Sequence, residues 1–401
     1  MNLATGSVKV FEGLVLYRRT RSSAWQCRYK HQNTWLRKST GCQALDNAKM
    51  QATTIWHEAQ ALVRLNLPVQ SKRFKDVAAT VIERLQAQIA SGKSKAIDKD
   101  YATCLRKYLV PYFAKHSVDK IDAALLGDFD DWRTEQMGKT PTKSTVATHN
   151  AALNLVLAEA EQRGWLSAAQ RPVLVNTGKR GEVRASFSKA EYEVIWRNLR
   201  HWVAKAPTER QRQVREVLWD YVLVLANTGI RHGTEAMNLK WHDIDWFEQD
   251  GQRYLRLTVR GKTSKRKGAR TVVARNNTQE YLRRQQLRFS DLAEKAFDDL
   301  LAAKVDEYVF RTADGQRTQN FANTLAKMFE AFLREYNLLY SSTSPLKRTL
   351  YSLRHMYATL ALQDGIGVYQ LAAHMGTSVA MIERHYSKFT SEMNAKAFAG
   401  G

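Results

Sequence analysis

Residues 226–239 read ANTGIRHGTEAMNL, and they decide how the carboxy-terminal half of the chain is interpreted. An apolar segment with helical spacing runs into Gly229, a residue that often ends helices because it adopts a left-handed backbone without steric cost. Arg231 follows directly, and the pattern predicts a second helix after it. Such a junction fixes the guanidinium from both sides, which suits a group that grips two oxygens of one phosphate. Glu235, about one helical turn further on, is predicted to hold Arg231 in place. An ordinary surface arginine after a helix end is the alternative.

A basic strand–turn–strand unit is predicted next, near residues 254–274. No acidic residue occurs from Gly251 to Gln279. The predicted turn is basic and contains Lys262, Lys265, Arg266 and Lys267. Such a hairpin can lie in a groove of DNA and bring one lysine to a reacting phosphate. Contact with the DNA backbone, without catalysis, is equally natural for most of these lysines.

Three short stretches nearer the carboxy terminus complete the pattern. They read YSLRHMYAT at residues 351–359, MGTS at residues 375–378 and IERHY at residues 382–386. Together with the arginine junction and the basic hairpin, they resemble the phage-integrase, or tyrosine recombinase, family. That family carries an Arg at a helix junction, a Lys on a hairpin, an HxxRH segment, an LGHS-type segment and then a nucleophilic Tyr. The resemblance covers the whole carboxy-terminal block and extends to residues 145–166, which look like the last helix of the family's core-binding domain.

The residues that match the family's motifs follow the same order along the chain. They are Arg231, Lys262, Arg354, His355 and Tyr386. The resemblance implies that Tyr386 attacks the phosphate, that Arg231 and Arg354 clamp its non-bridging oxygens, and that Lys262 protonates the leaving 5′ oxygen. His355 would assist by proton transfer or by orienting the phosphate. A phenol has a pKa of about 10, so neighbouring cations must favour the phenolate. This chemistry needs no metal ion, ATP or other cofactor.

Three positions depart from the family's pattern. Tyr351 stands where HxxR has its His, and Thr377 stands where the LGHS-type segment has His or Trp. His374, three residues upstream of Thr377, is a possible substitute. Glu235 is one residue further from Arg231 than the family's usual acidic position. Because Tyr351 and Thr377 can both donate a hydrogen bond to phosphate, an active enzyme with altered auxiliary donors is expected.

Composition points to a polyanionic partner. The 401 residues include 62 Lys and Arg against 39 Asp and Glu, which gives a net charge of +23 spread along the whole chain. Nucleic acid fits this distribution better than a membrane surface, which usually binds one amphipathic helix or a short basic tract. Cys27, Cys42 and Cys104 show neither disulfide nor zinc spacing. No apolar signal core or membrane span is found, so a cytoplasmic protein, bacterial or in a phage-infected host and nucleoid-associated, is expected.

The fold class expected is mainly α with small β elements (α+β). Residues 1–70 read as a three-stranded sheet plus a helix and are similar to arm-type DNA-binding domains. Residues 71–170 read as a helical core-binding bundle, residues 171–183 as a basic linker, and residues 184–401 as a mostly helical catalytic domain with a β-hairpin and a tail. No strand–helix–strand series indicates a doubly wound nucleotide fold.

Basic residues in all three domains are predicted to contact DNA. They are Arg18, Arg19, Arg28, Lys30, Arg37 and Lys38 in the first domain, Lys93, Lys95, Arg106, Lys107 and Lys143 in the second, and Lys265, Arg266 and Lys267 in the third. A solvated sheet face or helix surface is the alternative for each group.

The expected function is site-specific integration or excision of a mobile element by a DNA integrase. The resemblance implies double-stranded attachment sites, four copies of the chain on two sites, and possible accessory DNA-bending or directionality proteins. Two rivals stay open. One is a type IB topoisomerase-like enzyme, which the arm-like sheet disfavours. The other is a DNA-binding protein with decayed catalytic residues, which the substitutions Tyr351 and Thr377 keep open.

Overall fold

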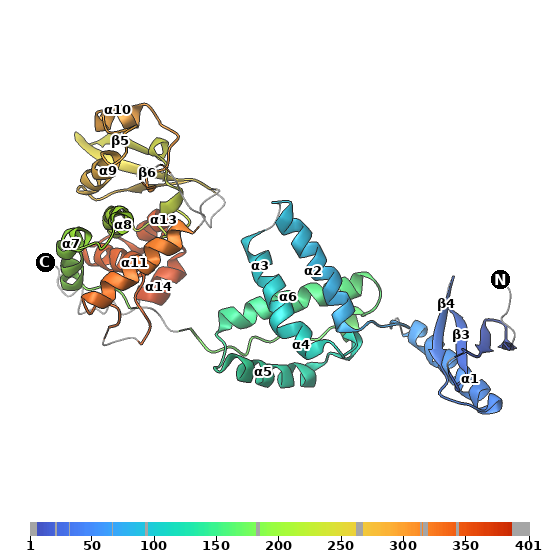
Figure 1. The fold of residues 1–401 in the computed structure, drawn as a ribbon. Helices are drawn as coiled ribbons and strands as arrows, with labels where there is room; N and C mark the ends of the chain where they lie inside the picture. The colour runs from blue at the N-terminus through green and yellow to red at the C-terminus, as the bar shows by residue number, and fades with distance from the viewer. Residues whose placement is uncertain are drawn as a thin grey trace. The chain divides into compact units, whose positions relative to one another are not determined.

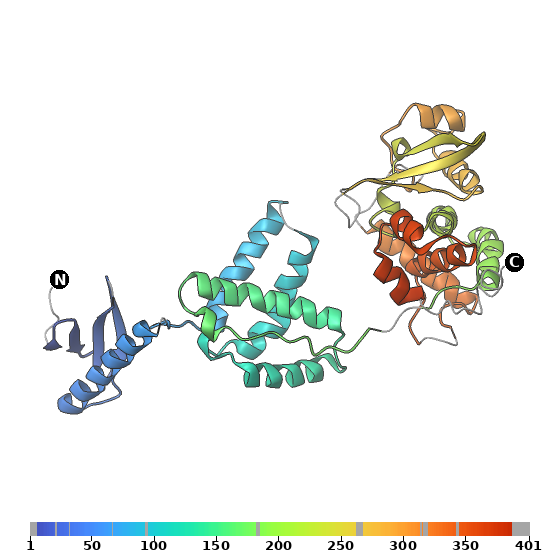
Figure 2. The ribbon, with the colours of Figure 1, turned by 180° about the vertical axis from the view of Figure 1, so that it is seen from behind.

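The computed structural model describes most of the chain and divides it into two units. The described residues are 6–20, 22–31, 33–65, 67–92, 95–181, 185–261, 268–312, 315, 320–341 and 345–386. The units are Met1–Gly181 and Glu182–Gly401, and Figures 1 and 2 show the elements within each from opposite sides. Within the described ranges, no helix has the length and apolar character that crossing a bilayer requires. The predicted class, mainly α with small β elements, is confirmed.

The first unit begins with a four-stranded antiparallel sheet rather than the three strands expected. The strands, in spatial order, are β1 (Val8–Phe11), β2 (Leu14–Tyr17), β3 (Gln26–His31) and β4 (Thr34–Ser39). The missed strand, β1, has only four residues and an irregular register against β2. Its signal is the two-residue turn Glu12-Gly13, in which Gly13 takes a positive φ of 88°.

Helix α1 (Leu45–Arg64) covers one face of this sheet. It presents small residues and one isoleucine, while alternate strand positions supply the opposite side of the core. The helix contributes Ala48, Ala52, Ile55 and Ala59, and the strands contribute Leu14, Leu16, Cys27, Tyr29 and Leu36. Since successive strand residues point to opposite faces, the intervening positions are left for the open face.

A helical bundle follows in the same unit. Its helices are α2 (Phe74–Ala90), α3 (Ala96–Cys104), α4 (Val110–Phe113), α5 (Ala123–Met137) and α6 (Lys143–Gln162), with one π-helical turn, Leu105–Leu109, joining α3 to α4. The core between them is apolar and aromatic, and includes Phe74, Phe113 and Phe129. This agrees with the helical pattern expected for this block.

The chain after the bundle runs back along it. The backbone N–H of Lys179 donates to Pro141 O at 2.9 Å, and that of Lys143 donates to Lys179 O at 2.8 Å. A Cβ at Gly178 would lie 2.6 Å from Lys143 N, so only glycine fits against the start of α6. Much of the expected linker of residues 171–183 is therefore held against the bundle, and the second unit begins at residue 182. The domain boundaries themselves stay a prediction.

The second unit is built around one long buried helix. This is α8 (Glu209–Thr228), which packs with α7 (Lys189–Ala204), α9 (Thr278–Gln286), α11 (Phe321–Glu335) and α12 (Leu350–Gln363). Its apolar residues continue on all sides in the last three turns, which explains why helices surround it. The remaining helices are α10 (Phe297–Ala302), α13 (Val368–Met375) and α14 (Val379–Tyr386).

The expected hairpin of this unit is one edge of a three-stranded antiparallel sheet. The strands are β5 (Ile244–Gln249), β6 (Gln252–Val259) and β7 (Arg270–Val273), in that order. The missed strand, β5, is joined to β6 by Asp250-Gly251, with φ values of 52° and 71°. That dipeptide is the usual residue pair of a tight two-residue hairpin turn, and it is the signal that could have predicted β5.

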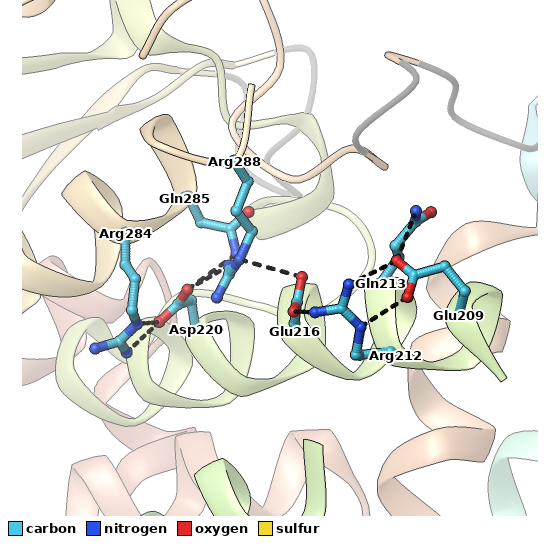
Figure 3. A network of polar contacts seen from close by, with 8 residues as sticks. All are labelled: Glu209, Arg212, Gln213, Glu216, Asp220, Arg284, Gln285 and Arg288. Atoms are coloured by element: carbon cyan, nitrogen blue, oxygen red, sulfur yellow. Dashed lines mark hydrogen bonds and ion pairs between the residues drawn. The ribbon is translucent and has the colours of Figure 1, made fainter. Parts of the chain in front are cut away.

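A buried carboxylate ties α8 to α9. Asp220 is fully buried and accepts hydrogen bonds from Arg284 Nε at 2.8 Å, Arg288 NH1 at 2.5 Å and Gln285 Nε2 at 3.2 Å. Figure 3 shows this network continuing along α8 to Glu216, Arg212, Gln213 and Glu209. The outer residues Glu209 and Arg212 are exposed to solvent, whereas Asp220 is fully buried, so removing the Asp220 charge would cost much more stability than removing an outer one.

Asp220→Asn is expected to lower the free energy of unfolding of the second unit by about 3–5 kcal/mol, because two guanidiniums lose their buried counter-charge. Chemical denaturation of the wild type and the variant measures the change. Asp298→Asn is the matched control, since Asp298 also pairs with an arginine, Arg253 NH1 at 2.9 Å, but its side chain is 54% exposed. That control should cost about 1 kcal/mol or less. Equal losses would contradict the role given to Asp220.

Candidate active site

Gly229 ends α8 and sets the position of Arg231. Its φ of 65° is left-handed, and a Cβ at this position would overlap the ring of Tyr357. Glycine is therefore required both for the backbone conformation and for the close approach of α12. The predicted second helix is wrong: a turn follows Arg231, and two short 3-10 turns, Ala236–Asn238 and Trp241–Asp243, lie between it and β5.

The turn serves to bring Glu235 back onto Arg231. The backbone N–H of Arg231 donates to Glu235 Oε2 at 2.8 Å, and its guanidinium NH1 donates to Glu235 Oε1. The Glu235 side chain is fully buried and that of Arg231 is 10% exposed. One carboxylate thus holds the arginine at its backbone and at its guanidinium.

The two predicted clamp residues, Arg231 and Arg354, both donate to carbonyl groups at the carboxyl ends of helices. Arg354, on α12, donates through NH1 to Gly229 O, at the end of α8, and through NH2 to Met375 O at 2.7 Å. Arg231 NH2 donates to Gly376 O, at the end of α13. Carbonyl groups at helix ends lack partners within the helix and carry partial negative charge, so they suit guanidinium donors. Each arginine therefore has a fixed direction before any ligand binds.

Burial and the charge of Arg231 lower the pKa of Arg354 to about 10. The side chain is therefore still cationic at neutral pH. Burial alone would raise the pKa of Glu235, but hydrogen bonds from Arg270 and from the Arg231 backbone lower it below the ordinary value. The pocket thus contains ionised groups of both signs.

Arg270 is a third arginine of this pocket, which the sequence analysis did not single out. It begins β7 and donates to both oxygens of Glu235, from NH1 at 3.0 Å and from NH2 at 2.7 Å. Its Nε donates to His374 O at 2.9 Å. Strand alternation was the available signal, because Arg270 lies on the same side of β7 as the buried Val272. Three guanidiniums and one carboxylate leave these four residues with a net charge of +2 (3 − 1).

The auxiliary residues differ in their surroundings. The His374 ring stacks on Tyr357, its Nε2 lies 2.9 Å from the Tyr357 hydroxyl, and burial lowers its pKa to about 4. Thr377 is partly buried and directly follows Gly376. Tyr351 is 38% exposed, and its ring meets that of His355 edge to face, with centroids 5.1 Å apart.

Of two further predicted catalytic residues, Tyr386 is placed by its backbone alone and Lys262 is outside the described part of the chain. Tyr386 is the last residue of α14, and its side chain lies outside the described part of the structure. Ile382 of the same helix packs with Leu371 and Met375 of α13. Lys262 lies outside the described residues, as do Lys265, Arg266, Lys267 and Lys93. The tail from residue 387 onward lies outside them too.

The sheet of the first unit brings three of its predicted basic residues to one face. Strand pairing sets Arg28 opposite Arg37, and Lys30 opposite Trp35, on the face that α1 does not cover. The Arg28 guanidinium lies over the Trp35 ring, 5.3 Å from its centroid. These side chains form an open, cationic and aromatic surface.

The other predicted basic residues of this sheet lie elsewhere. Lys38 points to the α1 side and pairs with Glu58 at 3.7 Å, because its strand position has the parity of the buried Leu36. Arg18 donates to Gln43 O at 3.1 Å and lies over Trp25, and Arg19 is exposed in the turn after β2. In the bundle, the predicted contacts at Lys95, Arg106, Lys107 and Lys143 are all exposed.

Comparisons with known proteins identify a matching family and similar folds. A family model described as the phage integrase family matches residues 187–392. No curated protein matches the sequence. The structure is similar to the Tn1549 transposon integrase in complex with circular intermediate DNA, with a TM-score of 0.54 and 17% identity over 79% of this chain and 98% of that chain. At this identity the likeness shows the fold.

Two further solved structures match with lower scores. The XerH recombinase bound to its difH substrate has a TM-score of 0.47 and 19% identity, over 74% of this chain and 75% of that chain. A lambda integrase dimer bound to a COC′ core site has a TM-score of 0.49 and 14% identity, over 96% of this chain and 95% of that chain.

Proposed function

The chain belongs to the phage integrase family of tyrosine recombinases, and from that premise we propose that it cuts and rejoins duplex DNA through a covalent bond between Tyr386 and a 3′ phosphate. The observation that carries the proposal is the pocket around Glu235. Arg231 and Arg270 share its carboxylate, Arg354 binds the neighbouring Gly229 O and Met375 O, and these four charged groups leave a net charge of +2 (3 − 1). Such an excess of buried positive charge suits a bound anion.

Arg231 and Arg354 are the groups proposed to hold the non-bridging oxygens of the scissile phosphate. Both are largely buried, at 8% and 4% exposure, so their attraction for an anion is screened less than at a surface. Both are fixed by carbonyl groups in advance, so little reorganisation accompanies the build-up of charge in the transition state. Each guanidinium can meet two oxygens at once, which a lysine cannot do.

Tyr386 is proposed as the nucleophile. Its helix, α14, packs on α13 through Ile382, and the carbonyl groups at the end of α13 hold Arg231 and Arg354. The phenol gives up its proton and its oxygen attacks phosphorus, the bond to the 5′ oxygen breaks, and the 5′ oxygen takes up a proton. The phosphotyrosyl ester retains the energy of the broken bond, so a second 5′ hydroxyl can displace the tyrosine without ATP.

Among the auxiliary donors, the surroundings favour Thr377 over His374. The His374 imidazole is engaged by the Tyr357 hydroxyl and stays neutral at pH 7, since burial lowers its pKa to about 4. Thr377 follows Gly376, whose carbonyl accepts from Arg231. His355 and Tyr351 lie on neighbouring turns of α12, and they are proposed to act as further hydrogen-bond donors to the phosphate.

Lys262 is proposed to protonate the leaving 5′ oxygen. Lys262→Ala should slow cleavage of ordinary DNA by about 10²–10⁴-fold, the usual contribution of general acid catalysis. Replacing the bridging 5′ oxygen of the scissile phosphate with sulfur should restore most of the rate, because a thiolate leaves without being protonated. Single-turnover cleavage of the two substrates measures this. A defect of equal size on both would contradict the general-acid role.

The basic first unit is proposed to hold the DNA around the cleavage site. Residues 71–170 would bind the core site of the DNA. Residues 1–70 would bind arm-type sites through the open sheet face that carries Arg28, Lys30 and Arg37. Four copies of the chain on two attachment sites, with accessory DNA-bending or directionality proteins, complete the proposed assembly.

A strand-exchange assay tests the function itself. Two duplexes carrying the end sequences of the element are mixed with the full-length protein in EDTA, and the products are separated under denaturing conditions. Recombinant strands together with a covalent protein–DNA adduct are expected. Relaxation of any supercoiled plasmid without joint molecules would favour the topoisomerase-like alternative. Tight DNA binding with no adduct at all would favour a decayed DNA-binding protein.

A further inference from the structure

Arg270 makes more contacts to the pocket than a residue on the edge of a DNA-binding hairpin requires. Its side chain is only 12% exposed, and both of its terminal nitrogens donate to Glu235. Among the described residues, Glu235 accepts two hydrogen bonds from Arg270 and two from Arg231, so its two oxygens are shared between these two cations. A residue that served only to contact DNA would be expected to point toward solvent.

The sharing of Glu235 determines how strongly Arg231 can attract a phosphate. Glu235 is fully buried and has two cationic neighbours, so a single negative charge is divided between them. If Arg270 were absent, the whole of that charge would face Arg231 and cancel its attraction for a phosphate. With Arg270 present, Arg231 keeps a net positive charge at close range, where the interior screens poorly.

Arg270 also links three segments of the pocket: β7, on which it lies, the turn that carries Glu235, and α13. It opens β7, which comes eight residues after Lys262 in the sequence. Its Nε donates to His374 O on α13, and a Cβ on Gly376 would lie 2.8 Å from that same Nε. The sheet is therefore seated against α13 at the place where Gly376 O accepts from Arg231.

Building on the proposed function, we propose that Arg270 is a positioning residue for strand cleavage, which shares the carboxylate of Glu235 with Arg231, so that the pocket keeps its net positive charge and the guanidinium of Arg231 stays aimed at the scissile phosphate. Arg270 itself does not touch the reacting atoms. Its effect passes through Glu235 and through the seating of β7 on α13.

The test compares three variants with the wild type, in single-turnover cleavage at saturating DNA and in DNA-binding titrations. Arg270→Met should cleave about 100-fold more slowly, the scale of losing one preorganised donor, with DNA affinity changed by about threefold or less. Arg270→Lys should recover part of the rate, since it restores the charge without the paired geometry. Arg270→Met combined with Glu235→Gln should cleave faster than Arg270→Met alone, because the uncompensated carboxylate is gone.

Arg256→Met is the matched control. Arg256 lies on the neighbouring strand, β6, and also forms a paired contact with a carboxylate, to Asp245 at 2.8 and 2.9 Å, away from the pocket. Its variant should cleave at the wild-type rate. A purely structural role for Arg270 would lower thermal stability in both Arg270→Met and the double variant and would give no rescue.

Two outcomes would overturn the inference while leaving the proposed function standing. One is a wild type that forms the covalent adduct together with an Arg270→Met variant whose rate is within about threefold of it. The other is a double variant no faster than Arg270→Met. Absence of an adduct from the wild type itself, on its own end sequences, would instead sink the proposed function, and the inference with it.

Discussion

Tyr386→Phe is expected to abolish the covalent protein–DNA adduct while leaving DNA binding unchanged. Phenylalanine keeps the ring and its packing but removes the only atom that can bond to phosphorus. Loss of a nucleophile reduces turnover by about 10⁴-fold or more in enzymes where it has been measured. The measurement is adduct formation on a nicked duplex that carries the element's own ends, resolved on a denaturing gel beside a binding titration.

The control for this change is Tyr369→Phe. Tyr369 lies on α13 and is 79% exposed, so it is a nearby tyrosine with no contact that the chemistry needs. It should form the adduct at the wild-type rate. An adduct that persists in Tyr386→Phe would show that another residue attacks, and it would invalidate the match between Tyr386 and the family's nucleophile.

Arg354→Lys is expected to slow cleavage by about 10²–10³-fold, even though the charge is retained. Arg354 divides its guanidinium between Gly229 O, Met375 O and, in the proposed reaction, the phosphate. A lysine has a single nitrogen at the end of a flexible stem and cannot hold two helix ends and an anion in fixed directions. Arg231→Lys should behave alike, since Arg231 bridges Glu235 and Gly376 O.

Arg348→Lys is the control for Arg354→Lys, because it separates a loss of stability from a loss of cleavage. Arg348 is also buried, at 3% exposure, and it joins Glu191 at 2.8 Å to Leu338 O at 3.1 Å, but it is not among the contacts of the pocket. Its variant should unfold at lower denaturant concentration while cleaving normally per folded molecule. If Arg348→Lys and Arg354→Lys lost cleavage to the same extent, the special role of the pocket arginines would be contradicted.

Several features of the second unit could be predicted because they are local in sequence. The apolar run before Gly229 and the arginine after it identify a helix end, whatever lies nearby in space. Glu235 lies only four residues from Arg231, so its proximity also follows from the sequence. Residues of the site that lie far along the chain from Arg231, such as Arg354, could be predicted only from the family's motifs.

Other features depend on contacts between distant segments. Arg270 meets Glu235 across 35 residues and His374 O across 104 residues. Strand alternation indicates that Arg270 is on the buried side of β7, but it does not indicate which residues Arg270 contacts. The turn after Arg231 was predicted as a helix because its composition permits one, whereas the pairing of Glu235 with two arginines favours a turn. Lys38 was grouped with Arg37 by charge, although neighbouring strand positions face opposite sides of a sheet.

The central claim is that the cleaved strand is carried on Tyr386, and peptide mapping of the covalent complex tests it most directly. The wild-type protein is trapped on nicked DNA, digested with a protease and a nuclease, and the modified peptide is sequenced by mass spectrometry. The prediction is a nucleotide 3′-phosphate on the peptide that contains Tyr386, attached at that residue. Attachment at any other residue, such as Tyr351 or His355 of α12, would contradict the claim.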